Sequence, residues 1–304
     1  MINKIIYPVI LLMVATISVY SQKIVKAVPS PNDEVVIFLL HTNDFGECYI
    51  EPLTIYKNKI FRTPPPMIPM PNGEEERFTP EGIEFAREYL QKGFGYFAVN
   101  SGVSEKIIVI NETLSLKMTS EDYGWFRPIT AGIEYLKKLK EEQKLFTNSL
   151  SLVKKQFDKV KLTTKDENIL LSQFSKRYKD ENGVNSNEKI ILNTVNAISP
   201  TSSKKSLIIV AEFSVEQKSI NVKKDYSVIF EGSSGNFKIT YLRSLWTCFE
   251  SSGDYWNEGE IFVSAGDLDF DGSIELVMGV GSGYAIFKKI DGTWKSVYMI
   301  LYGS

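Results

Sequence analysis

Short strand-like segments separated by polar turns fill residues 188–304 of the chain. Apolar runs rich in β-branched and aromatic residues, such as SLIIVAEFSV and DYSVIFEG, alternate with turn sequences such as EGSSGN and IDGT. Runs of this length and spacing are typical of antiparallel strands joined by tight turns. We therefore expect this part of the chain to form an antiparallel β meander or sandwich.

The preceding region, residues 22–130, has mixed character. Residues 34–41 (EVVIFLLH) form a short apolar run that predicts a buried strand, and residues 49–56 predict a weaker one. Residues 79–93 predict a helix, because a threonine and a proline stand at its start and a glycine at its end. Residues 94–118 look extended. The pattern predicts an α+β region.

Residues 131–180 predict a helical hairpin. A capping-box pattern at Thr164 and Glu167 starts the second helix. The first helix follows from apolar residues that recur at steps of three and four. Those residues are Leu136, Leu139, Phe146, Leu150, Val153, Phe157 and Val160. Such a pair of helices either packs on its own domain, which we favour, or forms a coiled-coil stalk. A polar, glycine-containing break at 180–187 marks a domain boundary, and the fold class expected for the whole chain is α+β.

The first 21 residues have the layout of a cleavable signal peptide. Lys4 precedes an apolar run from Ile5 to Val19, and small residues lead up to Gln22, which would start the mature chain. An uncleaved membrane anchor is the alternative, but the run is about 15 residues long and a spanning helix needs roughly 20. We expect a secreted or periplasmic protein with no membrane span after cleavage.

The charge and cysteine content restrict the possible partners. A formal net charge of −2 and a pI near 5.8 give no electrostatic reason to expect nucleic acid or an anionic membrane. The two cysteines, Cys48 and Cys248, could pair in an oxidising compartment or remain two separate thiols.

One short acidic sequence, GDLDFDGSIEL at residues 266–276, points to specific chemistry. Alternate carboxylates on a tight loop can converge on a hard cation that prefers oxygen ligands, and glycine permits the sharp bend. The predicted Ca²⁺ ligands are Asp267, Asp269, Asp271, the backbone carbonyl of Ser273, and Glu275. The alternative is an acidic turn that forms without a metal ion.

The acidic sequence is not an EF-hand, because Met278 stands where that loop needs a bidentate glutamate and a strand-like segment follows. It resembles instead the calcium loops of FG-GAP and VCBS-type repeat proteins, in which D-x-D-x-D-G-x-x-E/D joins two strands. The resemblance covers about 50 residues, 255–304, with a single copy of the motif. It implies the ion loop but no propeller, for which the β region is too short.

A second sequence, FLLHTNDFG at residues 38–46, resembles the opening of exported 5′-nucleotidases of the metallophosphatase superfamily. That resemblance implies metal binding by Asp44, but the second histidine of the pattern is missing. His41 is the only histidine in the chain, whereas a two-metal site of that class needs several. The same count leaves His41 as the only possible base for a serine or cysteine nucleophile.

These features predict an exported, non-catalytic binding or structural protein with a calcium-stabilised β domain. The expected partner is a protein or glycan at the cell envelope, and nucleic acid is not expected. The alternative is a secreted hydrolase that uses a pair of carboxylates, whose spacing in sequence is not fixed, or the degenerate HTND strand.

Overall fold

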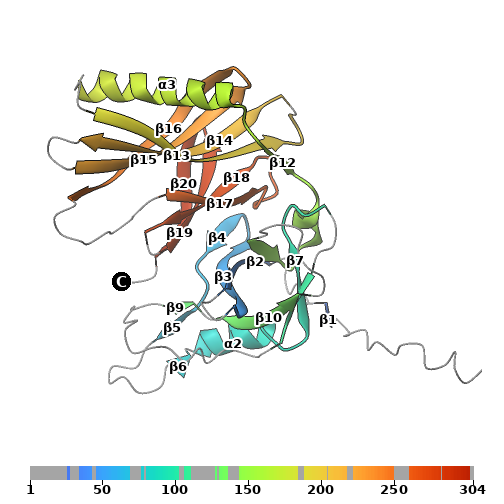
Figure 1. The fold of residues 1–304 in the computed structure, drawn as a ribbon. Coiled ribbons are helices and arrows are strands. Elements are labelled where there is room, and N and C mark those ends of the chain that lie inside the picture. Colours follow the sequence, from blue (N-terminus) through green and yellow to red (C-terminus); the bar gives the residue numbers. More distant parts are fainter. Residues whose placement is uncertain are drawn as a thin grey trace, which may run out of the picture.

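The computed structural model shows a mostly β protein, and the α+β fold class predicted from the sequence is wrong. Figure 1 shows a barrel, two antiparallel sheets and a long helix. The structure describes residues 26–27, 34–42, 46–68, 77–78, 80–102, 106–110, 127–128, 130–135, 144–183, 188–203, 205–217, 222–249, 260–281 and 283–301.

The N-terminal half forms a closed antiparallel barrel of six strands in the order β7-β11-β2-β3-β10-β8, with β8 pairing back to β7. Closure removes the free sheet edges of this region. A short strand pairs with each of two barrel strands: β1 is parallel to β7, and β4 is antiparallel to β3. The strands are β1 (Lys26–Ala27), β2 (Val35–Thr42), β3 (Cys48–Lys57), β4 (Ile60–Arg62), β7 (Phe94–Ala98), β8 (Lys106–Val109), β10 (Ala131–Tyr135) and β11 (Leu145–Thr147).

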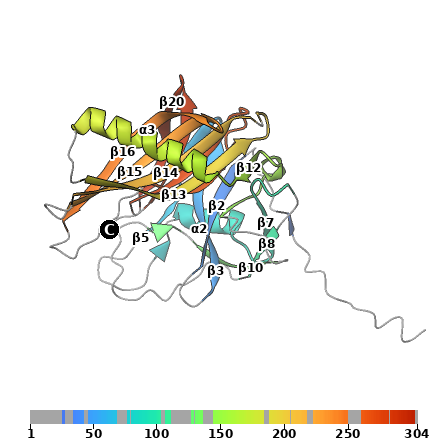
Figure 2. The ribbon, with the colours of Figure 1, turned by 45° about the horizontal axis from the view of Figure 1, so that its top comes forward.

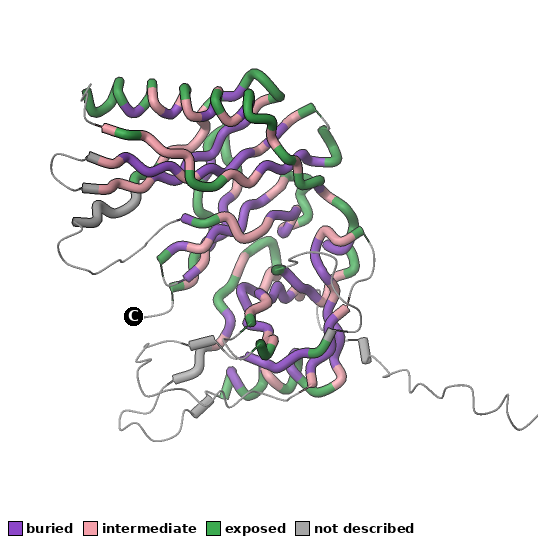
Figure 3. Tube along the Cα trace, in the orientation of Figure 1, coloured by how far each residue is buried: buried purple, intermediate pink, exposed green. Residues whose placement is uncertain are grey.

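The barrel interior is a hydrophobic core to which helix α2 (Pro80–Tyr89) contributes. Phe38, Ile50 and Tyr96 are fully buried there, and α2 adds Phe85 and Tyr89. Figure 3 shows the buried stretches following the barrel strands. The segments predicted at 34–41, 49–56 and 79–93 therefore occur as β2, β3 and α2. A small sheet of β5 (Pro66–Ile68), β6 (Arg77–Phe78) and β9 (Arg127–Pro128) lies outside this order.

A five-stranded antiparallel sheet carries helix α3 (Thr164–Asn182) on one face. Leu170, Phe174 and Tyr178 step along one side of the helix and pack onto the sheet, where Phe174 stacks on Phe213 at 4.2 Å between ring centroids. Figure 2 shows the helix crossing the strands. The strands are β12 (Phe157–Val160), β13 (Glu188–Pro200), β14 (Leu207–Gln217), β15 (Val222–Ser233) and β16 (Asn236–Phe249).

A four-stranded antiparallel sheet lies between the five-stranded sheet and the barrel (Figure 1). Its strands are β17 (Glu260–Gly266), β18 (Glu275–Val280), β19 (Gly283–Ile290) and β20 (Thr293–Leu301). Leu276 and Trp294 pack toward the five-stranded sheet, whereas Val277 and Tyr298 pack toward the barrel. The sheet is therefore buried on both faces.

The predicted helical hairpin is wrong in its first helix. Residues 131–135 and 145–147 are barrel strands, residues 150–153 form the 3-10 helix η2 (Leu150–Val153), and residues 157–160 are β12. Leu136 and Leu139 lie outside the described residues, and Leu150 is 63 % exposed. The second helix exists as α3, and its capping box begins one residue earlier than predicted, at Thr163 with Asp166.

Three further expectations concern the membrane, the signal peptide and the two cysteines. No described helix is both long enough and apolar enough to cross a membrane. The predicted signal peptide lies outside the described residues. Cys48 is a free thiol, 3.6 Å from the Oγ1 atom of Thr42, and the side chain of Cys248 lies outside the described part of the chain.

Candidate metal centre

The acidic sequence forms the loop between β17 and β18. These strands pair antiparallel, and Gly266 opposite Glu275 closes the ladder beneath the loop. Two residues have positive φ, Phe270 at 63° and Gly272 at 88°. Glycine adopts this conformation freely, whereas a phenylalanine there is strained. The chain therefore bends sharply in the middle of the loop, as the sequence predicted.

Contacts from distant parts of the chain fix the inner side of the loop. Leu268 is fully buried in the core between the four-stranded sheet and the barrel. The hydroxyl of Tyr56, on β3, donates to the backbone carbonyl of Asp269 at 2.9 Å. The backbone N–H of Asp267 donates to the side-chain carbonyl of Gln156 at 2.8 Å. The loop is thus held by the barrel and by the segment that leads into β12.

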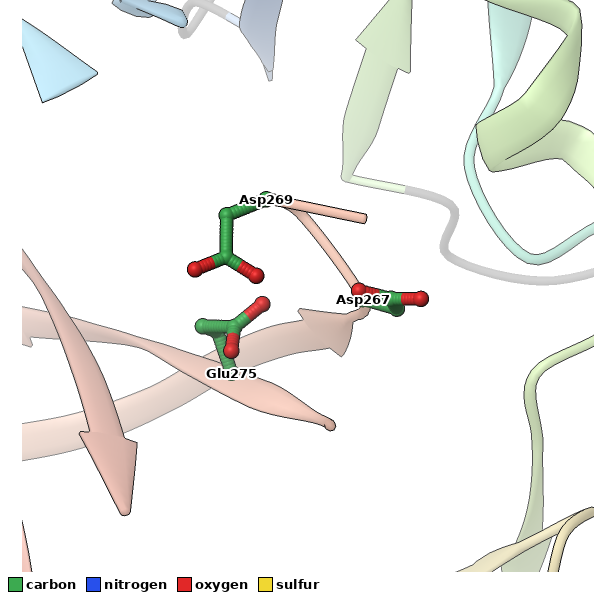
Figure 4. A group of neighbouring side chains, drawn as sticks. All are labelled: Asp267, Asp269 and Glu275. Carbon is green, nitrogen blue, oxygen red and sulfur yellow. The ribbon is translucent and has the colours of Figure 1, made fainter. Parts of the chain in front are cut away.

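Asp267, Asp269 and Glu275 bring their carboxylates together (Figure 4). One ligand oxygen from each lies within 4.8 Å of those of the other two, and no other group of three or more potential ligands occurs in the described ranges. Each of the three also has one buried oxygen without a hydrogen-bond partner: Oδ1 of Asp267, Oδ1 of Asp269 and Oε1 of Glu275. Buried, unpaired carboxylate oxygens are costly, and a bound cation would satisfy them.

Burial and the charges of neighbouring acids raise the pKa of two acids of this triad, Glu275 and Asp267. Glu275 is fully buried, and its other oxygen accepts the backbone N–H of Leu268 at 2.7 Å. Burial, and then the charge of Asp269, raise the pKa of Glu275 to about 8. Burial also raises the pKa of Asp267, against a hydrogen bond from the backbone of Gly272. A cation bound beside these carboxylates would favour their ionised forms and so oppose both shifts.

Two of the five predicted ligands lie outside the triad. Asp271 accepts the backbone N–H of Ser273 at 2.8 Å and the ammonium of Lys288 at 2.6 Å. The hydrogen bond from Lys288 is the main reason that the pKa of Asp271 is lowered. Ser273 is exposed and contributes no side chain to the group. Of the four carboxylates that the sequence predicted as ligands, the structure brings three together, and the backbone carbonyl of Ser273 stays a predicted ligand.

Lys288, on β19, is a residue that the sequence reasoning missed. Its ammonium also contacts the Oδ2 atom of Asp269 and lies 3.7 Å from the Oε1 atom of Glu275. Partial burial lowers the pKa of Lys288, but the hydrogen bonds to Asp269 and Asp271 outweigh that effect and raise it overall. The loop therefore combines four carboxylates with one internal cation.

The chemistry of the triad is that of a hard-cation site. All of its side-chain ligands are carboxylate oxygens, which suit Ca²⁺, Mg²⁺ or Mn²⁺ better than metals that prefer nitrogen or sulfur. Three side chains do not complete the six to eight ligands of Ca²⁺, so backbone carbonyls or water would supply the rest. The triad can hold a metal ion, but its geometry alone does not distinguish calcium from the other hard cations.

The histidine of the HTND sequence lies beside a carboxylate and an aromatic ring. His41 lies on β2 with its Nε2 atom 3.2 Å from Oε2 of Glu51, and its ring stacks on Tyr49 at 5.2 Å between centroids. A carboxylate of the neighbouring strand β3 therefore lies beside the histidine. Asp44 lies outside the described residues.

Comparisons with known proteins identify no relative. No protein-family model matches the chain, and neither the curated proteins nor the solved structures contain a match. The structure itself defines the chain as a mostly β protein in which a barrel and two stacked antiparallel sheets share buried cores.

Proposed function

We propose that this is an exported, non-catalytic binding or structural protein whose loop between β17 and β18 holds a calcium ion. One observation carries the metal part of the proposal: three acidic side chains converge, and each keeps a buried oxygen without a hydrogen-bond partner. The resemblance of the loop to FG-GAP and VCBS-type repeats favours calcium among the hard cations. The ion would stabilise the joint between the four-stranded sheet and the barrel.

The proposed role is structural because the loop is built into the core. Leu268 anchors it in the interface, and Tyr56 and Gln156 bind its backbone. A catalytic metal needs an open position for substrate, whereas these contacts fix the inner side of the loop. A protein or glycan at the cell envelope is the partner class we propose, through surfaces other than this loop.

Thermal denaturation with calcium and with EDTA tests the metal site. Because the folded chain would bind the ion and the unfolded chain would not, calcium at a hundredfold excess over Kd should add about 2.7 kcal/mol to the free energy of unfolding. Extracellular modules bind calcium at roughly 0.1–1 mM, so millimolar calcium should raise the melting temperature. Mg²⁺ should substitute poorly, since it requires tighter octahedral geometry.

Two variants make this test specific to the loop. Asp269→Ala removes one of the three converging carboxylates and should abolish the calcium dependence. Asp180→Ala, at an exposed position of α3, should leave it intact. Identical melting curves with calcium and with EDTA, in a protein that native mass spectrometry shows without bound ion, would rule out the metal site.

Export is tested separately by N-terminal sequencing. Protein recovered from the periplasm or the medium should begin at or within a few residues of Gln22, as the signal-peptide pattern predicts. An intact Met1 on protein that remains in the membrane fraction would contradict the proposed export.

A further inference from the structure

Lys288 is the one positive side chain among the described residues that pairs with the acidic loop. It reaches the loop from β19, the strand that pairs with β18. Its ammonium bonds to the Oδ2 atoms of Asp269 and Asp271 and lies 3.7 Å from Oε1 of Glu275. Two of these three acids, Asp269 and Glu275, belong to the triad.

We infer that Lys288 is an internal competitor of the metal ion and sets the calcium concentration at which the loop fills. The inference rests on the proposed function and adds to it how that site is regulated. A divalent cation beside Asp269 and Glu275 would lie close to the ammonium of Lys288, and like charges at such a distance repel strongly where burial limits the solvent. For a metal ion to bind, either Lys288 moves away or the repulsion between its ammonium and the metal ion weakens the binding.

Asp271 connects this competition to the predicted set of ligands. The spacing of the acidic sequence predicts Asp271 as a ligand, but in the structure its Oδ2 atom faces Lys288. Once Lys288 leaves, the carboxylate of Asp271 is free to turn toward the triad. The same lysine thus controls both the local charge and the number of acidic ligands.

The consequence is a site tuned to respond to calcium. Four carboxylates without an internal cation would bind calcium tightly and stay filled, and they would repel one another when calcium is absent. Lys288 relieves that repulsion, so the loop keeps its fold at low calcium and binds the ion only when its concentration rises. The loop contacts the barrel through Tyr56 and Leu268, so filling it would stabilise the joint between barrel and sheet.

The test compares Lys288→Met with Lys289→Met. Methionine keeps much of the length of the lysine and removes its charge. Lys289 is the next residue on β19 and pairs with Glu231, away from the loop, so it serves as the matched control. Calcium affinity is measured by isothermal titration calorimetry, and the melting temperature is measured in EDTA and in saturating calcium.

We expect Lys288→Met to bind calcium at least tenfold more tightly than the wild-type protein. Its melting temperature in EDTA should be lower, and calcium should raise that temperature by more than in the wild-type protein. Lys289→Met should bind calcium as the wild-type protein does. If Lys288→Met does not fold in EDTA, it is purified with calcium and its affinity is measured by competition with a chromophoric chelator.

The outcomes separate this inference from the proposed function. Wild-type protein that binds calcium, together with a Lys288→Met variant of equal or weaker affinity, would overturn the inference and leave the metal site standing. Binding by neither protein would overturn both. Binding by Lys288→Met alone would support the competition and show that in the wild-type protein the lysine itself is the resident cation.

Discussion

The surroundings of Glu275 disfavour the ionised form of its carboxyl group. Its carboxylate is fully buried, Asp269 is a near neighbour, and one of its oxygens has no hydrogen-bond partner. The backbone N–H of Leu268 stabilises the ionised form, but burial dominates and raises the pKa to about 8. Near neutral pH, a cation and a proton would therefore compete for this residue.

The first prediction concerns how stability in EDTA depends on pH. The folded pKa of Glu275 is about 8, above the ordinary value of 4.5, so the folded protein holds a proton that the unfolded chain has released. The resulting stabilisation is complete below pH 4.5 and is lost as the pH rises to 8. A difference of this size between the folded and unfolded pKa corresponds to a loss on the order of 5 kcal/mol. Urea denaturation at a series of pH values measures it, and Glu275→Gln, which cannot titrate, should flatten the profile.

The second prediction is that Glu275→Gln weakens calcium binding by about 100-fold or more, because loss of a direct ligand should exceed the 10–100-fold effect of losing a supporting group. Glutamine keeps an oxygen for the N–H of Leu268, so the loop should retain its fold. Calorimetric titration gives the affinity, and circular dichroism confirms the fold. Wild-type affinity in this variant would show that Glu275 is not a ligand.

Sequence spacing could predict the converging acids but not their partner Lys288. Asp267, Asp269 and Glu275 follow one another in a recognisable pattern, whereas Lys288 comes from another strand. A signal was present nonetheless: the ladder pairs Val280 with Gly283 and Leu276 with Phe287. One more step of that register places Lys288 opposite Glu275. Cross-strand neighbours of this kind are found only after the register of a hairpin has been fixed.

At the scale of elements, residues 145–160 show why spacing alone predicted a helix wrongly. Leu145, Phe146 and Thr147 are consecutive and all buried, because β11 lies between β2 and β7 in the closed barrel. Apolar residues from a strand, a 3-10 helix and a second strand then happen to follow one another at steps of three and four, although Leu150 among them is exposed. Short apolar runs cannot distinguish these alternatives.

Helix α3 was predictable because its signals are local. The side chain of Thr163 accepts from the backbone N–H of Asp166, and the carboxylate of Asp166 accepts in return. Asp166 also accepts from Ser234 and from the backbone of Gly235, in the turn between β15 and β16. This second set of bonds joins the start of the helix to the sheet that it covers. No local sequence pattern predicts these long-range bonds.

The third prediction is that Asp166→Ala lowers the free energy of unfolding by about 1–2 kcal/mol, the usual effect of losing a helix cap. The bond with Thr163 is the first cause of the lowered pKa of Asp166, so its stabilising effect should fade in acid, as the carboxylate becomes protonated. Urea denaturation at neutral pH measures the loss. Asp180→Ala, exposed on the same helix, should change stability by no more than about 0.5 kcal/mol. Equal effects of the two substitutions would mean that the cap does not stabilise the fold.

At the scale of the whole molecule, the order in which the barrel and the two sheets stack could not be predicted from the sequence. The expected organisation kept the N-terminal region and the C-terminal β domain apart, whereas the four-stranded sheet has one face on the five-stranded sheet and the other on the barrel. The closing pair of the barrel, β7 with β8, and the contacts of β3 with the distant C-terminal strands depend on the assembled fold. Apolar residues on both faces of a strand predict that the strand is buried, but they do not identify the element that covers each face.

Tyr298 links the two halves of the chain at an irregular point of the barrel. The β2–β3 ladder shifts register between Ile37 and Phe38, so Leu53 is skipped in the pairing of the two strands. The buried hydroxyl of Tyr298, on β20, donates to the carbonyl of Leu53 at 2.8 Å. The bond satisfies a backbone group at a bulge, where ladder pairing is interrupted.

The last prediction is therefore that Tyr298→Phe destabilises the barrel and the four-stranded sheet together. Phenylalanine keeps the ring in the shared core but leaves the carbonyl of Leu53 without this donor, at a cost of about 1–3 kcal/mol. Hydrogen exchange followed by mass spectrometry should show reduced protection both in β2–β3 and in β17–β20. Val297→Ala, partly exposed on the same strand, should have a much smaller effect. Loss of protection confined to β17–β20 would show that the barrel is stable without its contact to the C-terminal sheet, and the joint that calcium is proposed to stabilise would then matter little to the barrel.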